Sequence, residues 1–297
     1  MGKRLTIGMT MKKASSLLIF VLIVNTGYTQ SQFLQDYQFL IHLESISSYN
    51  EGLVFLNNVK DKYSSRGQLD TLNFYQAKFE YYQKNRLKSN SYFDKVSKNN
   101  LNYWNASKFY SSLQFSYLGN YDLAVKSLEQ VDSLSTVLLE LKNLELAGIA
   151  LLSRDFDKYS TFSKSYASDH FQLKDHHIAL DQTFEEMQAR KSKSPFLAGM
   201  MSAVIPGTGK FYLGKIGQGT MSLMTSGIFA LQAYEGYRKG GSKSPAFLIF
   251  GGLFSVFYIG NIWGSVVAVR VEQLSINKSN DETILLHMHI PMRLLLK

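Results

Sequence analysis

The sequence contains no cysteine and very little proline. Its 297 residues include 0 cysteines and 4 prolines, and none of the prolines falls between positions 31 and 190. Without thiols the chain can form neither disulfides nor a lipid-modified cysteine. Proline interrupts helices, so its absence leaves the stretch from 31 to 190 free to be helical throughout.

Nucleotide-binding motifs are also absent, although residues 204–219 are rich in glycine and contain lysine. A phosphate-binding loop requires Gly-Lys followed by Ser or Thr, whose hydroxyl holds magnesium. Here Gly209-Lys210 is followed by Phe211, and Tyr212 stands in place of the third glycine of a dinucleotide fingerprint. We therefore expect these glycines to serve a turn and close packing, and we expect no nucleotide cofactor.

Histidine is scarce and forms no metal-binding pattern. Close pairs occur only at His176-His177 and His287-x-His289. The second pair would share one face if residues 284–290 formed a short strand. Metal sites need three or four ligands, and no carboxylate or cysteine completes a set nearby. No serine or threonine lies in a nucleophile motif, so we expect no catalytic residues, no bound metal and no enzymatic activity.

Positive charge is in excess, at a formal +9, but it forms no basic stripe. Nucleic-acid binding is therefore not expected. Four cations precede an apolar run at residues 15–24, namely Lys3, Arg4, Lys12 and Lys13. A basic segment followed by a short apolar core is typical of a secretory signal. We predict a signal peptide at residues 1–29; the alternative is an uncleaved anchor, although the core is shorter than the ~20 residues of a span.

Residues 30–190 contain a repeat with a period of about 35 residues. The clearest copy runs from Leu118 to Leu128, and weaker copies begin near Arg154, Lys84 and Tyr49. The clearest copy resembles the turn and second helix of a tetratricopeptide-like hairpin. The residues expected in its core are Phe115, Gly119, Tyr121, Ala124 and Leu128. The resemblance implies stacked helical hairpins that bind a protein or peptide; an ordinary helical bundle is the alternative.

A change in composition near residue 191 marks a second domain, predicted at residues 191–270. Cations and Pro195 end the helical region, and glycine becomes frequent. Residues 216–234 and 244–269 carry no charge, and spans of ~20 apolar residues cross a bilayer. We predict two transmembrane helices here, preceded by a short apolar segment and followed by a tail at residues 271–297.

Small residues recur at every fourth position in both predicted spans. One stripe consists of Ser222, Ser226 and Ala230, and the other of Gly260, Gly264 and Ala268. Small side chains let transmembrane helices approach closely. We therefore expect the two stripes to face each other in a helical hairpin.

Proline, glycine, aromatic residues and lysine are combined immediately before the first span. The residues that we expect at the membrane turn and interface are Pro206, Gly207, Gly209, Lys210, Phe211, Tyr212, Gly214 and Lys215. This Pro-Gly-x-Gly segment with its aromatic pair resembles the start of a bacterial two-transmembrane-helix domain. Such domains follow exported helical repeats in bacterial envelope proteins. The resemblance implies a turn at the membrane surface, with aromatic rings and lysines among the lipid headgroups.

Together these features predict an all-α chain in which an exported helical-repeat domain precedes a membrane-embedded helical hairpin. We expect a non-enzymatic adaptor or scaffold of the cell envelope, anchored in the inner membrane with the repeat domain on the periplasmic side. Its expected partners are membrane lipid and an unidentified protein or peptide. The alternative is a small transporter or channel component, with Asn261 lining a path.

Overall fold

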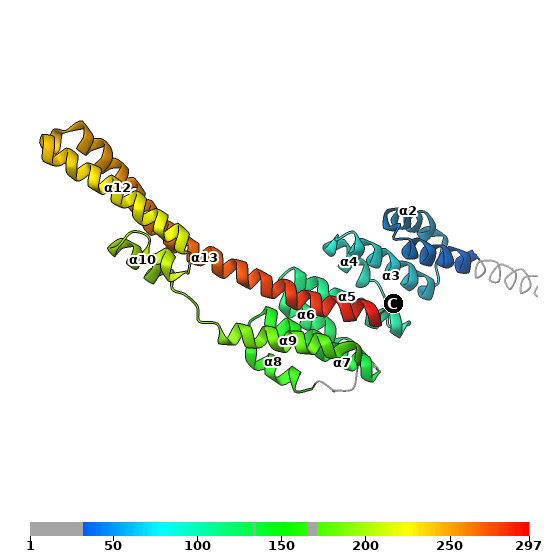
Figure 1. Ribbon diagram of the computed structural model, residues 1–297. Coiled ribbons are helices and arrows are strands. Elements are labelled where there is room, and N and C mark those ends of the chain that lie inside the picture. The colour runs from blue at the N-terminus through cyan, green and yellow to red at the C-terminus, as the bar shows by residue number, and fades with distance from the viewer. Residues whose placement is uncertain (1–31, 133–134, 166–170, 297) are drawn as a thin grey trace, which may run out of the picture. The chain divides into compact units, whose positions relative to one another are not determined.

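The structure is a computed structural model that describes residues 32–132, 135–165 and 171–296 (Figure 1). The described residues form helices and contain no strand. The predicted signal peptide at residues 1–29 lies outside them. The chain divides into two compact units: one ends at His177 and also takes in the residues from Met288 on, and the other runs from Ile178 to His287.

The first unit is a series of paired helices. A helix at residues 32–45 comes first. It is followed by α2 (Tyr49–Val59), η1 (Lys60–Lys62), α3 (Arg66–Tyr82), α4 (Arg86–Phe93), α5 (Leu101–Tyr117), α6 (Tyr121–Glu129), α7 (Thr136–Leu152), α8 (Phe156–Ser163) and α9 (Phe171–Ala189), which continues into the second unit. The long helices α3, α5 and α7 each pack against the short helix that follows. Each pair is thus a helical hairpin.

The same turn joins the two helices of every pair. It places one residue in the left-handed region, at Ser47, Lys84, Gly119 and Arg154, with φ between 58° and 74°. The next residue then donates its amide to a carbonyl of the preceding helix, as Asn120 N does to Phe115 O at 2.9 Å. This is the arrangement of a Schellman cap, in which glycine is the favoured left-handed residue. Only Gly119 meets that preference, which explains why the sequence pattern is clearest there.

The core of the first unit is rich in aromatic residues. Phe93 and Tyr110 stack with ring centroids 5.4 Å apart, and Phe74 lies 5.9 Å from Phe93. Of the predicted repeat residues, Ala124 and Leu128 are fully buried. Phe115 and Tyr121 are half-buried, and Gly119 is exposed in its left-handed turn.

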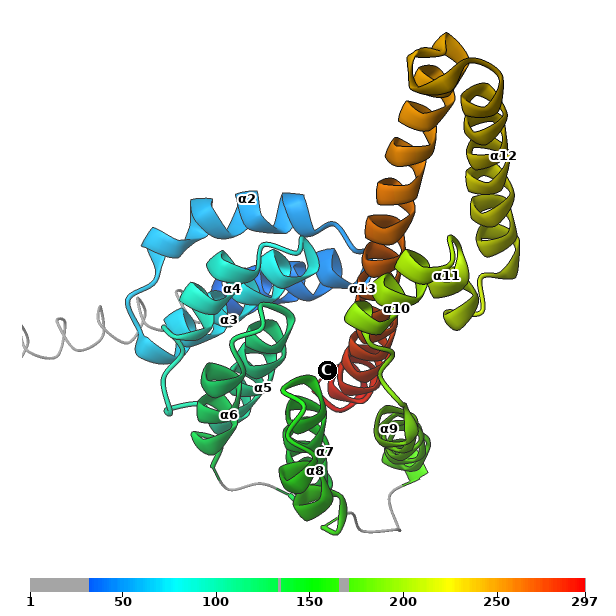
Figure 2. The same cartoon turned by 90° about the vertical axis from the view of Figure 1, so that its left-hand side faces the viewer.

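The second unit contains two long helices and two short ones. Its elements after α9 are α10 (Pro195–Val204), α11 (Thr208–Tyr212), α12 (Ile216–Gly240), η2 (Gly241–Lys243) and α13 (Pro245–Leu295). The first half of α13 lies beside α12 in both views (Figures 1 and 2). Phe229 packs on Phe257 at 5.0 Å and Tyr237 on Phe247 at 5.5 Å. The later residue on α12 thus contacts the earlier residue on α13, so the two helices are antiparallel.

Within the described part of the chain, α13 is the one helix long and apolar enough to cross a membrane. We predicted two such helices, and α12 does not meet the same criterion. Most of the apolar surface of α13 is exposed, including Val256 and Trp263. The structure thus contains a single long apolar helix near its C-terminus.

The tail differs from the strand considered for residues 284–290, because α13 continues through Pro291 to Leu295. Ile284, Met288 and Met292 are fully buried and stand four residues apart. That spacing places them on one face of a helix, whose burial outweighs the hydrogen bond lost at proline. His287 and His289 consequently point to different sides of the helix rather than to one strand face.

Candidate functional site

The main candidate site is a groove in the first unit that holds the chain's own C-terminal segment. A cavity of about 210 Å³ remains beside that segment. It is lined by Tyr81, Tyr82, Lys84, Arg86, Tyr117, His289 and Arg293. We call this site, together with the floor that α7 supplies, the tail groove.

Apolar side chains fix the segment in the tail groove. Met288 and Met292 are completely buried, and Leu296 is 8 % exposed. The floor under Met288 is Gly148 of α7, where an added Cβ would come within 2.5 Å of the Met288 sulfur. Only glycine leaves room for the thioether at this position. The groove is therefore shaped for a helix that presents methionines four residues apart.

Polar and aromatic contacts complete the recognition of the segment. The Tyr81 hydroxyl lies 2.6 Å from His289 Nε2, and the Arg293 guanidinium lies 5.0 Å from the centre of the Tyr82 ring. Burial, followed by the charge of Arg293, lowers the pKa of His289. A neutral imidazole protonated on Nδ1 accepts a hydrogen bond from the Tyr81 hydroxyl at Nε2. Burial likewise raises the pKa of Tyr81 well above its usual value, so this tyrosine remains a donor.

A carboxyl group without a partner lies near the floor of the groove. Glu145 precedes Gly148 by about one turn of α7 and is completely buried. Neither of its carboxyl oxygens has a hydrogen-bond partner. Burial raises the pKa of Glu145 well above the ordinary value. Its proximity also helps to raise the pKa of Tyr81 and Tyr117, although burial is the larger cause for both.

The arrangement in the tail groove is suited to binding. The described residues contain no cluster of three or more histidine and carboxylate side chains that could hold a metal. The groove combines aromatic rings with a deep apolar floor, and an apolar groove that receives one face of a helix is the feature of helix-in-groove recognition.

In the second unit, the glycine-rich segment lies where α10, α11, α12 and α13 come into close contact. We call this region the crossing. Gly207 adopts φ 93°, and a Cβ there would collide with the carbonyl oxygen of Gly219. Gly209 is buried where an added Cβ would collide with the carbonyl oxygen of Ala198. Its amide donates to Ser202 Oγ at 3.0 Å, which in turn bonds Ser265 Oγ at 2.8 Å. These glycines serve a turn and close packing.

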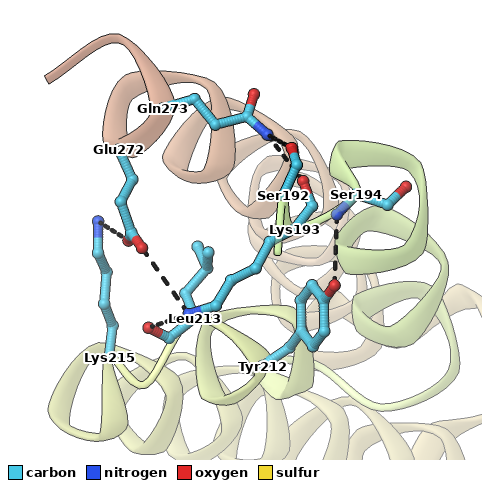
Figure 3. Close-up of polar contacts among 8 residues, drawn as sticks. All are labelled: Ser192, Lys193, Ser194, Tyr212, Leu213, Lys215, Glu272 and Gln273. Atoms are coloured by element: carbon cyan, nitrogen blue, oxygen red, sulfur yellow. Dashed lines mark hydrogen bonds and ion pairs between the residues drawn. The ribbon is translucent and has the colours of Figure 1, made fainter. Parts of the chain in front are cut away.

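A polar collar joins this crossing to α13 (Figure 3). Glu272 lies 3.7 Å from both Lys193 Nζ and Lys215 Nζ. Gln273 Nε2 donates to the Lys193 carbonyl at 2.8 Å, and the Tyr212 hydroxyl accepts from the Ser194 amide at 3.3 Å. The collar thus ties the start of the unit to α13 beyond its apolar half.

The remaining residues predicted at the membrane turn surround the crossing. Phe211 packs on Gly219, where an added Cβ would come within 2.5 Å of the ring. Pro206 is half-buried, and Gly214 forms a second left-handed turn with φ 80°. Lys210 turns back to α12 and donates to Ser222 Oγ at 2.6 Å.

The packing stripe on α13 lies one residue beyond the predicted one. An added Cβ at Gly260 or Gly264 would meet nothing within 4 Å. The buried positions are instead Asn261, Ser265 and Val269. Both stripes have residues at every fourth position, but only the second faces Ser202 and Ala198.

The stripe predicted on α12 is divided among different surroundings. Ser226 is buried, whereas Ser222 accepts from Lys210 and Ala230 lines a separate cavity nearer the tip of the hairpin. Ala268 packs beside Val269 on the cluster that contains Leu213. The two predicted stripes therefore do not pack against each other along their whole length.

Most residues that hold the tail in the groove were not among those expected from the sequence. The missed set is Glu145, Gly148, Met288, Met292 and Arg293, and His289 was considered only as one of a histidine pair. A signal was present, because apolar residues recur every fourth position from Ile284 to Leu296. Pro291 obscured this helical spacing, because a proline normally ends or kinks a helix.

No protein-family model, curated protein or solved structure matches this chain. The function is therefore inferred from the residues and the geometry of the two units.

Proposed function

We propose that this chain is a non-enzymatic adaptor of the bacterial cell envelope, in which a tetratricopeptide-like domain binds a helical segment of a protein. Residues 191–270 would anchor it in the inner membrane. The single observation that carries the proposal is the tail groove, which already holds a helix by two buried methionines. Tetratricopeptide-like arrays bind their ligands on a surface of this kind.

The repeated turns support the tetratricopeptide-like assignment. Left-handed residues at Lys84, Gly119 and Arg154 recur about every 35 residues, close to the period of ~34 residues typical of such repeats. In each of these hairpins the fourth residue of the second helix is buried, namely Ser89, Ala124 and Tyr159. The first helices α3 and α5 supply tyrosines to the tail groove and α7 supplies Gly148, while Lys84 and Arg86 come from the turn after α3 and the start of α4.

The second unit supports a membrane anchor of two helices. We propose that the first half of α13 spans the bilayer and that α12, although less apolar, spans beside it as a hairpin. Arg238 and Lys239 lie in the last turn of α12, and Lys243 ends η2, which connects α12 to α13. The positive-inside rule favours placing these cations in the cytoplasm, which leaves the repeat domain and the collar on the periplasmic side.

Anchoring predicts how the full-length protein behaves in fractionation. We expect it to remain in the inner-membrane pellet after carbonate or high-salt washing, because a spanning hairpin buries its apolar surface in lipid. Immunoblotting of the washed fractions measures this. Release of the protein into the carbonate supernatant would contradict the two-helix anchor.

The partner of the tail groove should be an amphipathic helix with apolar residues at every fourth position. A labelled peptide of residues 284–297 is a direct probe for binding in trans by fluorescence anisotropy. In the wild-type chain the tethered tail already occupies the groove and competes with the peptide. The double variant Met288→Ser and Met292→Ser weakens that competitor, so it should bind the peptide at least about tenfold more tightly.

Two further variants control this experiment. Leu294→Ser alters an exposed residue of the same segment and should bind the peptide no better than wild type. Adding Gly148→Leu to the double variant should abolish binding, since its side chain occupies the place of Met288. Equal binding with and without Gly148→Leu would show that the groove is not the binding surface.

The alternative, a small transporter or channel component, has less support. A path would require polar side chains along the whole of the hairpin. Instead, Lys210, Ser222 and Asn261 gather near the collar end, and the apolar Leu248, Ile249 and Leu253 follow toward the tip.

A further inference from the structure

A second cavity lies in the second unit, between α11, α12 and α13. Its volume is about 590 Å³, within the range of about 300–1,000 Å³ of small-molecule sites. It is lined on the polar side by Lys210, Ser222, Ser226 and Asn261, and on the apolar side by Met221 and Phe257 among others. We call it the hairpin cavity.

Lys210 brings a positive charge to this cavity without a carboxylate to neutralise it. Its ammonium donates to Ser222 Oγ at 2.6 Å, and an ammonium has three donors. Lys193 and Lys215, by contrast, share Glu272. Among the described residues, the side chain that accepts from the Lys210 ammonium is the neutral Ser222 hydroxyl.

Asn261 is the second unsatisfied group. The side chain is 6 % exposed, and neither its amide nitrogen nor its amide oxygen has a hydrogen-bond partner. A buried amide without partners is costly, and more so at a depth where lipid replaces water. The amide therefore offers two N–H donors and one acceptor oxygen to a ligand in the cavity.

The position and walls of the cavity suit an amphiphile. Asn261 lies about 14 Å along α13 from Arg270, at a rise of about 1.5 Å per residue. Arg270 directly follows the uncharged stretch of α13 at residues 244–269, so the polar end of the cavity lies about a third of the way along that stretch from its collar end. Met221, Val256 and Phe257 are exposed apolar side chains beside it, and they provide a surface along which an acyl chain can lie.

We propose that the hairpin cavity binds an anionic phospholipid whose phosphodiester carries a hydroxyl-bearing headgroup, as phosphatidylglycerol does. The phosphate accepts from the Lys210 ammonium and the Asn261 amide nitrogen, and the headgroup hydroxyl donates to the Asn261 amide oxygen. This inference rests on the proposed membrane anchor and is independent of the tail groove.

The test uses the purified full-length protein in lipid nanodiscs and native mass spectrometry of the retained lipids. We expect the wild-type chain to retain phosphatidylglycerol at least about tenfold more strongly than phosphatidylcholine, equivalent to about 1.4 kcal/mol. Lys210→Gln and Asn261→Leu should each remove that preference. Inorganic phosphate at millimolar concentration should not displace the lipid, because it lacks the acyl chains that fill the apolar side.

The matched control is Lys215→Gln, which removes one nearby cation that already has Glu272 as a partner. It should keep the preference for phosphatidylglycerol. Equal retention of phosphatidylglycerol by the Lys210→Gln and Lys215→Gln variants would show that the preference comes from general attraction between cations and anionic lipid. That result would overturn the proposal. Displacement of the lipid by inorganic phosphate would show that the cavity binds a free anion rather than a lipid. That result would also overturn the proposal.

Asn261→Leu gives a readout that separates a ligand site from a structural role. Without lipid this variant should have a higher midpoint of thermal unfolding than wild type, because it removes the unpaired amide; with phosphatidylglycerol the order should reverse. A lower midpoint in both conditions would mean that Asn261 is structural. Normal incorporation into nanodiscs without lipid preference would refute the lipid site alone, whereas failure of wild type to incorporate would refute the anchor as well.

Discussion

Replacing Glu145 with methionine is expected to raise the free energy of unfolding of the repeat domain by about 1–3 kcal/mol at pH 7, the range for a buried polar group without a partner. Glu145 is fully buried, and both of its oxygens lack hydrogen bonds. Methionine has a similar length, carries no charge and, as Met288, already packs on the floor of this groove. Urea unfolding of the full-length protein in detergent, followed by circular dichroism, measures the change.

The pH dependence of this effect has a definite sign. Burial raises the pKa of Glu145 in the folded protein above its ordinary value of 4.5, so the folded state holds its proton more tightly than the unfolded state. The stabilising contribution is complete below the unfolded pKa and is lost as the pH rises through the folded pKa. Wild type should therefore become less stable from pH 4.5 upward until the raised folded pKa is passed.

Glu145→Gln isolates the ionisation from the packing. It retains a buried polar group but cannot ionise, so its stability should not show this decline with pH. Glu129→Gln, at an exposed position of α6, should keep the wild-type slope. A Glu145→Gln variant with the same slope as wild type would assign the pH dependence to other groups.

The sequence predicted the helical class of the first unit because its evidence is local. The absence of proline allowed helix across residues 31–190, and Gly119 belonged to the turn of the clearest repeat copy, where the structure gives it a left-handed conformation. The equivalent turns at Ser47, Lys84 and Arg154 lack glycine. There the packing of the hairpins imposes a conformation that the residue itself does not favour.

The contacts between distant segments could not be predicted in the same way. On α13, adjacent stripes of small or polar residues begin at Gly260 and Asn261, and both have helical spacing. Composition alone cannot choose between them, since the choice depends on the rotation of the helix. The structure buries the stripe of Asn261, Ser265 and Val269.

The tail groove was missed for a related reason. Pro291 lies inside α13, where a proline normally weakens or ends a helix. The buried side chains of Met288 and Met292 compensate for that cost through contacts with residues more than a hundred positions earlier, such as Gly148. Neither the absence of partners at Glu145 nor the fit of Met288 over Gly148 can be recognised from the local sequence.

Of the single substitutions in the tail, those at its two buried methionines are expected to lower the stability of the docked segment most. Met288→Ala and Met292→Ala each remove a fully buried side chain, a change that typically costs about 2–5 kcal/mol. Leu294→Ala, at an exposed position of the same helix, should change stability by less than about 0.5 kcal/mol. His289→Ala should fall between them, since it removes the hydrogen bond to Tyr81, worth about 1 kcal/mol.

Hydrogen exchange followed by mass spectrometry distinguishes undocking of the tail from unfolding of the whole domain. Because the groove is built by α3, α5 and α7, we expect exchange in the alanine variants to increase first in residues 288–296, with the helices of the hairpins still protected. Increased exchange in α7 at the same rate would mean that the tail is part of the folding core rather than a separable ligand. Protection of residues 288–296 equal to wild type in both methionine variants would show that these side chains do not hold the segment in the groove.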